Sequence, residues 1–169
     1  MAEIEKSIFV LRRPSTVWEQ LASSVHIEKW WGKGVFLDPQ PGGKFHEPWQ
    51  DTSGNHLAVG TVIKCKPNEF IHFTWAEDSW PKGFETSVEI HFIPKFSGTE
   101  VTVRHKGWTI FSKDDQSSNI QSFSEGWEYL LSKLKNAAEE THTEDLFDSD
   151  ELTHPVRWID PPDGDRTAV

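Results

Sequence analysis

Hydrophobic and polar residues alternate along most of the first two thirds of the chain, and this period of two predicts β-strands. The first alternating stretch covers residues 3–13 and ends at Pro14. The later stretches are separated by turn residues such as proline, glycine and asparagine. They cover residues 35–37, 44–47, 59–65, 70–75, 87–93 and 99–105.

The same alternation assigns faces to the longer strands. In the strand at 87–93, Val88 and Phe92 lie on one face and Glu89 lies on the other. In the strand at 59–65, one face carries Val59, Thr61, Ile63 and Cys65. One apolar and one polar face are typical of an antiparallel sheet that is buried on one side only.

Two short segments after the first strand have helical spacing instead. Val17, Trp18 and Leu21 recur at steps of one, three and four within residues 15–24, and a second short helix is predicted over residues 26–31.

A much longer helix is predicted at residues 117–140, near the C-terminus. Asp114 or Ser117 can cap its start. Its apolar residues recur every three or four positions and are Ile120, Phe123, Trp127, Leu130, Leu131 and Leu134.

The order of these elements predicts the fold class. One strand, two short helices, a run of antiparallel strands and a long final helix make an α+β domain. The long helix is the element able to cover the buried face of the sheet, so we expect a curved sheet that grips it around an apolar space. The adjacent Trp30 and Trp31 are expected at the edge of that space.

Charge divides the chain into two parts, which we interpret as a domain at residues 1–140 and an acidic tail at 141–169. The net charge is −10, and residues 139–169, with ten acids and two bases, hold −8 of it. This balance argues against nucleic acid and anionic membranes as partners. The tail is either a flexible acidic appendage or, through its segment LTHPVRWIDPP, a docking element for its own domain, a second subunit or a partner protein.

The remaining bulk features predict an intracellular, cytoplasmic protein. The N-terminus lacks a basic start followed by an apolar segment, and no apolar run approaches the ~20 residues of a membrane helix. The lone Cys65 cannot form an internal disulfide.

Six sequence stretches together resemble a known family. In chain order they are RRPSTVWEQL, EKWWG, PQPGGKF, GTVIKCKPNEFIHFTW, GTEVTVRHKGW and EGWEYLLSKL. This order and spacing resemble the homologues of the activator of heat shock protein 90 ATPase, within the START-like (SRPBCC) helix-grip superfamily. The resemblance covers residues 3–138 and implies a seven-strand sheet wrapped on the long helix, with an apolar pocket between them. It implies no fixed catalytic set, and relatives bind lipids, polyketides or other apolar molecules.

Aromatic residues are the main candidates for a ligand site, because the chain has nine tryptophans and only one tyrosine. Apolar walls with a few polar groups are typical of ligand sites. The predicted ligand-binding residues are Trp30, Phe36, Phe45, Trp49, Trp75, Trp80, His105, Trp108, Phe123 and Trp127. The alternative is that these residues simply fill the core.

Catalytic and metal chemistry find little support in the residue pattern. His105, on the inward face of its strand, is either an acid or base for a ligand or a core histidine satisfied by a neighbour. Glu47, Glu77 and Asp78 are expected to be solvated rather than to enter the pocket mouth. No metal-ligand spacing, phosphate-binding loop or nucleophile elbow is present. We therefore expect no catalytic residue, no metal and no cofactor.

Three functions remain open at this point. The first is a binding module for a hydrophobic or aromatic small molecule. The second is a cyclase- or dehydratase-like enzyme acting on a polyketide-like substrate. The third, by family analogy, is a chaperone-linked interaction protein.

Overall fold

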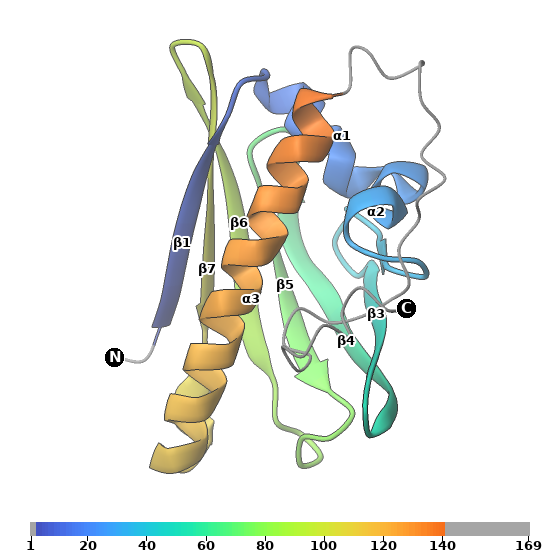
Figure 1. The fold of residues 1–169 in the computed structure, drawn as a ribbon, viewed down its shortest axis with the longest axis vertical. Helices are drawn as coiled ribbons and strands as arrows, with labels where there is room; N and C mark the ends of the chain where they lie inside the picture. The colour runs from blue at the N-terminus through green and yellow to red at the C-terminus, as the bar shows by residue number, and fades with distance from the viewer. Residues whose placement is uncertain (1–2, 141–169) are drawn as a thin grey trace.

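A single antiparallel sheet of seven strands forms the body of the protein in the computed structural model, which describes residues 3–140 (Figure 1). The strand order is β1-β7-β6-β5-β4-β3-β2, so the first strand closes the sheet beside the last. The strand bounds are β1 Glu3–Val10, β2 Phe36–Leu37, β3 Lys44–Asp51, β4 Gly54–Lys66, β5 Phe70–Glu77, β6 Thr86–Lys95 and β7 Gly98–Lys106. The curved sheet, the long C-terminal helix and the α+β helix-grip class are confirmed.

Two short helices follow β1, as the spacing predicted. They are α1 (Pro14–Ala22) and α2 (Ser24–Trp30). The Ser23 side chain caps α2 by accepting a hydrogen bond from the backbone N–H of His26. Among the described residues, no helix has the length and apolar character needed to cross a membrane.

The long helix α3 (Lys113–Glu139) begins earlier than the prediction. Its N-cap is Ser112, which accepts from the Asp115 backbone N–H, so neither Asp114 nor Ser117 has that role. The single-turn 3₁₀ helix η1 (Trp108–Ile110) precedes α3 and leads the chain out of β7. Hydroxyl caps and acidic first-turn residues both favour this start.

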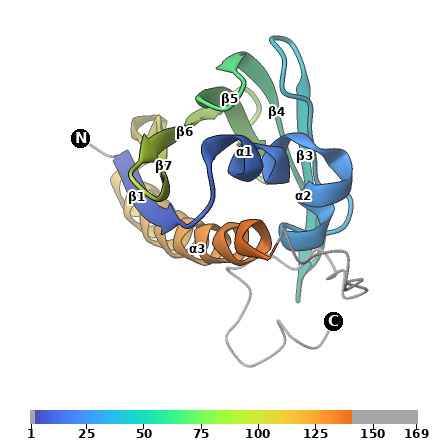
Figure 2. The same ribbon diagram turned by 90° about the horizontal axis from the view of Figure 1, so that it is seen from above.

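The C-terminal end of α3 is fastened to the edge strand β1. Lys135 Nζ donates to the Phe9 carbonyl at 2.8 Å, and the Glu139 carboxylate accepts from the Leu11 backbone N–H at 2.8 Å. Arg12 donates to the Glu139 carbonyl. These bonds occupy backbone groups at a sheet edge that would otherwise be open to pairing. Seen from above, α3 lies beside β1 and β7, whereas α2 lies near β3 (Figure 2).

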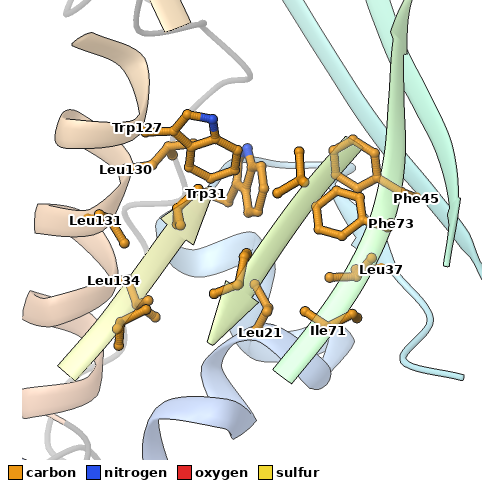
Figure 3. Packing of buried hydrophobic residues seen from close by; sticks show 14 of the residues in the cluster. Leu21, Trp31, Leu37, Phe45, Ile71, Phe73, Trp127, Leu130, Leu131 and Leu134 are labelled. Carbon is orange, nitrogen blue, oxygen red and sulfur yellow. The ribbon is translucent and has the colours of Figure 1, made fainter. Parts of the chain in front are cut away.

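The core lies between the inner face of the sheet and the three helices. Trp31 reaches toward Trp127 of α3, and Phe45 of β3 and Phe73 of β5 lie together across β4 (Figure 3). A row of leucines from α3 continues the same apolar layer. Burying this many large side chains supplies the main stabilising term for a domain of this size.

One strand shows a face opposite to the expected one. On β4 the buried residues are Ala58 and Val62, whereas Val59 and Ile63 are exposed. The face with Val59, Thr61, Ile63 and Cys65 is therefore largely the outer one. A register irregularity between Val62 and Lys64 also interrupts the strict alternation.

Candidate functional site

Two glutamates and an alanine form a row across the inner face of the sheet. In the strand register, Glu47 of β3 is opposite Ala58 of β4, and Ala58 is opposite Glu77 of β5. All three residues are buried. Neighbouring strands are about 4.8 Å apart, so the backbones of the glutamates are about 10 Å apart with only a methyl group between them. We call Glu47, Ala58 and Glu77 the carboxylate row.

Tryptophans supply hydrogen bonds to this row. Trp31 Nε1 donates to Glu47 Oε2 at 3.0 Å. Trp49 Nε1 donates to Glu77 Oε1 at 3.1 Å, and Trp75 Nε1 donates to Glu77 Oε2 at 2.8 Å. Both oxygens of Glu77 thus accept hydrogen bonds.

The burial of these acids is unusual and has an energetic cost. Glu47 is 3% exposed and Glu77 is 7% exposed. Taking a carboxylate out of water costs several kcal/mol unless other groups replace its hydration. Indole N–H groups replace part of that hydration. The row is therefore a polar position within an otherwise apolar interior.

Aromatic rings surround the row on the side toward α3. Phe45 and Trp75 have ring centroids 4.9 Å apart, and Trp31 stacks on Trp75 at 6.5 Å. Trp31 also meets Trp127 of α3 edge to face at 6.0 Å. On the other side of the row, Trp49 stacks on His56 with centroids 4.3 Å apart.

The hairpin between β3 and β4 holds His56 in place beside that tryptophan. His56 Nε2 lies 3.0 Å from Asp51 Oδ1, and its Nδ1 lies 3.6 Å from Asp78 Oδ1. A hydrogen bond from the Ser53 hydroxyl is the main cause that lowers the pKa of Asp51, with smaller contributions from the Ser53 backbone and His56. The hairpin end therefore carries two acidic groups beside His56.

His105 occupies a second polar position in the core and is fully buried. Its Nδ1 accepts from Trp127 Nε1 at 3.0 Å, and its Nε2 lies 2.8 Å from Thr86 Oγ1. Because Nδ1 accepts, the ring is neutral with its proton on Nε2, which donates to Thr86. Thr86 in turn donates to the Trp75 carbonyl at 3.2 Å. Both ring nitrogens thus have hydrogen-bond partners within the core, which is what the core-histidine alternative expects.

Comparison with known proteins identifies the family. The model of the family described as activator of Hsp90 ATPase homolog 1-like protein matches residues 12–139. This chain belongs to that family. A search of curated proteins gave no match.

Solved structures share the fold of this activator of Hsp90 ATPase homolog 1-like chain. Protein MLL2253 from Mesorhizobium loti is 20% identical with a TM-score of 0.69, over 82% of this chain and 98% of that one. The Aha1 dimer from Colwellia psychrerythraea is 20% identical with a TM-score of 0.65, over 82% and 97%. DynU16, a protein of the dynemicin biosynthetic locus, is 16% identical with a TM-score of 0.68, over 95% and 51%.

The structure brings most of the predicted ligand residues of this family member into one buried aromatic cluster. Phe36 is separate from it, because its strand position points outward and leaves it 44% exposed. Trp30 belongs to the cluster but directs its Nε1 to the Gln20 carbonyl at 2.9 Å. Trp80 is partly buried and packs on Phe111. The remaining members are Phe45, Trp75, His105, Trp108, Phe123 and Trp127. Trp49 is also buried, but its ring stacks on His56 of the hairpin. Ligand binding by these residues stays a prediction.

Sequence reasoning missed three residues of the site. The sequence places Trp31 at the edge of the apolar space but not among the predicted ligand residues. The expectation that Glu47 and Glu77 are solvated is wrong for both. Asp78 is indeed largely exposed. The signal that could have found the glutamates is parity: Glu47 alternates in step with Phe45 and Glu77 with Trp75, so each points inward with its aromatic neighbours.

Proposed function

We propose that this protein binds a small hydrophobic or aromatic molecule between the sheet and α3, and that the ligand places a cationic nitrogen over the carboxylate row. The observation that carries this proposal is the pair of buried carboxylates, Glu47 and Glu77, on either side of Ala58. The family fold supports a small ligand-binding domain, and the row adds the polar group that fixes orientation.

The residues around the row favour a cation over other polar groups. Two carboxylates attract a positive charge and repel an anion at short range. Trp31, Trp49 and Trp75 all border the row. An arylalkyl amine combines the apolar body and the charge that such surroundings would stabilise.

The access route is expected near Trp49. Trp49 and Glu77 are 8% and 7% exposed, whereas Trp75 and Phe73 deeper in the cluster are 0% exposed. A ligand would therefore meet the carboxylate row before the inner rings. Movement of the Trp49 ring away from Glu77 would open the way, because that side chain lies on the last part of β3 beside the hairpin.

A panel of three matched compounds tests the proposal. The compounds are an arylalkyl amine, its uncharged N-acetyl derivative and the carboxylic acid on the same ring system. Tryptophan emission and the unfolding midpoint are recorded against concentration. We expect the amine to raise the midpoint and change the emission, the amide to do so weakly and the acid not at all. Equal responses to amine and acid would refute the role of the carboxylates.

A substitution at the centre of the row gives the matching protein control. Ala58→Leu fills the space between the two glutamates, so it should abolish the response to the amine. Val59→Leu changes the adjacent residue, whose side chain is on the outer face, and should leave the response intact. If both variants respond like the parent protein, the ligand binds elsewhere.

Family membership supports a second candidate function, that of a chaperone-linked interaction protein. The test is the ATP hydrolysis rate of a purified Hsp90 chaperone with and without this protein in excess. A reproducible increase would support the second candidate, and an unchanged rate would reject it. This assay does not involve the carboxylate row, so the two proposals are independent.

The geometry gives less support to a cyclase- or dehydratase-like enzyme. Such a reaction needs an acid or base that reaches the substrate. His105 was the candidate, but its Nδ1 and Nε2 are hydrogen-bonded to Trp127 and Thr86 in a fully buried position. We therefore assign His105 a packing role.

A further inference from the structure

We propose that residues 156–159, VRWI, dock on the outer face of this chain's own sheet, with Trp158 in a groove between β1 and the β6–β7 hairpin. The segment lies outside the described residues. The groove is on the face of the sheet opposite to the carboxylate row and to α3. The contact therefore needs no ligand and goes beyond the binding function proposed above.

The groove is formed where β1 runs beside the tip of the β6–β7 hairpin, and its volume is about 430 Å³. Phe9 follows the partly buried Ile8 and precedes the buried Val10, so its side chain points to the outer face. A pocket of this size is in the range that holds a drug-sized molecule, so a tryptophan side chain fits. The lining residues are Ser7, Ile8, Phe9, Lys95, Phe96, Ser97 and Glu100.

Large apolar side chains gather around this groove on the surface. Phe96, at the hairpin tip, is 103% exposed, and Phe9 and Ile93 are each 39% exposed. In the strand register Phe9 of β1 and Ile93 of β6 are both opposite Glu100 of β7, so they lie on either side of it. Apolar side chains that collect at one place on a surface are typical of an interaction site. This part of the outer face therefore favours an apolar occupant.

The C-terminal end of α3 leads the chain to the same end of the sheet. Lys135 Nζ donates to the Phe9 carbonyl, and Glu139 accepts from the Leu11 backbone N–H, each at 2.8 Å. Phe9 thus bonds the last turns of α3 through its backbone and lines the groove with its side chain. Figure 1 shows the C-terminal end of α3 and the β6–β7 hairpin at one end of the molecule. The residues after Glu139 therefore begin close to the groove.

The length of the following chain suits this contact. Trp158 comes 18 residues after Glu140. These residues reach up to about 60 Å when extended. As a flexible chain they have an end-to-end distance of about 23 Å. That is enough to pass around β1 to the outer face, and a tether of this length keeps the segment at a millimolar effective concentration. The tether therefore favours the chain's own domain over a second copy.

Charge selects this segment over the other apolar pair of the tail, Leu146 and Phe147. That pair stands among five acids in residues 144–151, whereas residues 152–159 contain no acid. The charged residues of the groove, Lys95 and Glu100, form an ion pair at 3.5 Å and so offer little attraction to a strongly acidic segment. In residues 156–159, the cation Arg157 can approach Glu100 while Trp158 fills the groove. Tryptophan is also among the residues that most often dominate binding at an interface.

Two substitutions in the tail of the full chain test the proposal. Trp158→Ala and Phe147→Ala each remove one aromatic side chain from the same acidic segment. The readouts are the backbone amide resonances of Phe9, Phe96 and Glu100 and the thermal unfolding midpoint. We expect Trp158→Ala to shift these resonances and to lower the midpoint by about 2–4 °C. Phe147→Ala should leave both unchanged.

A reciprocal substitution in the groove locates the contact. The Phe96 ring is fully exposed within the described residues, so Phe96→Ala leaves the core of the domain intact. It should shift the indole N–H resonance of Trp158. Phe36→Ala, at a 44% exposed position on β2 at the opposite edge of the sheet, should not. In the Phe96→Ala background, Trp158→Ala should lower the midpoint less than it does in the parent protein.

Three results would overturn the proposal. Groove resonances that Trp158→Ala leaves unchanged would show that the segment does not dock there. Equal shifts caused by Phe147→Ala would assign the groove to the other apolar pair. Shifts that grow with protein concentration would assign it to a second copy of the chain. All these measurements are made without a ligand and away from the carboxylate row, so their failure leaves the proposed function untouched.

Discussion

Trp127 of α3 donates its indole N–H to His105 Nδ1 of β7 at 3.0 Å, in the centre of the core. The bond joins the long helix to the sheet and fixes which nitrogen of His105 carries the proton. Buried polar atoms cost most when their partner is removed, so this pair should matter more to stability than its single hydrogen bond suggests.

The first prediction concerns that pair. Trp127→Phe keeps an aromatic ring but leaves His105 Nδ1 without its donor, and we expect it to lower the free energy of unfolding by about 1–3 kcal/mol. Urea unfolding followed by circular dichroism measures the change. Trp18→Phe is the control, because it makes the same change from indole to phenyl at another core position, where Trp18 packs edge to face on Phe92. If the two variants lose equal stability, the hydrogen bond adds nothing beyond ring packing.

The second prediction tests the acceptor role of Glu77. In Glu77→Gln the amide nitrogen must face either Trp49 or Trp75, so one indole N–H meets a donor instead of an oxygen. The expected loss is about 1–3 kcal/mol in the free energy of unfolding. Glu85→Gln, at an exposed position, should change it by less than about 0.5 kcal/mol. If the unfolding curves of the two variants coincide, Glu77 is solvated and is not an important acceptor for the two indoles.

Much of the fold could be read from the sequence because its signals are local. Strand alternation and the spacing of Phe123, Trp127, Leu130 and Leu134 depend only on which side of one element must be buried. These signals predict the sheet and the long helix that packs on it. They do not predict where α3 begins, because Ser112 caps the helix before the apolar pattern begins.

The site could not be predicted in the same way, since it depends on three strands meeting. Glu47 and Glu77 are 30 positions apart and become neighbours only through Ala58. A carboxylate in a strand is usually solvated. The chemistry of glutamate therefore favours the outer face, although the alternation along the strand places both residues on the inner one. Phe36 shows the opposite error: its aromatic side chain suggested the interior, but its place on β2 leaves it exposed.

The third prediction concerns the close approach of β4 and β5. A Cβ added at Gly60 would lie 1.7 Å from the Thr74 carbonyl oxygen, so Gly60→Ala must push the two strands apart. We expect a loss of about 3 kcal/mol in the free energy of unfolding. At Gly83, whose φ is +89°, an added Cβ meets nothing within 4 Å. Gly83→Ala should therefore cost only the backbone strain of about 1–2 kcal/mol. A smaller effect at Gly60 than at Gly83 would contradict this packing.

The fourth prediction uses the anchor between α3 and β1. Burial would raise the pKa of Glu139, but hydrogen bonds from Lys135 and the Leu11 backbone, together with the charges of Lys135 and Arg12, outweigh it and lower the pKa. A carboxyl group whose pKa is lower in the folded state stabilises that state above its unfolded pKa of about 4.3. The stabilisation is lost as the pH falls through the folded pKa.

Glu139→Gln should therefore be less stable than the parent protein at pH 7, and the difference should shrink as the pH is lowered from about 5 to about 3. Unfolding midpoints of both proteins across this range measure it. Glu128→Gln, exposed on the same helix, controls for the loss of one negative charge. If the stability difference stays constant down to pH 3, the negative charge of Glu139 does not contribute to the anchor between α3 and β1.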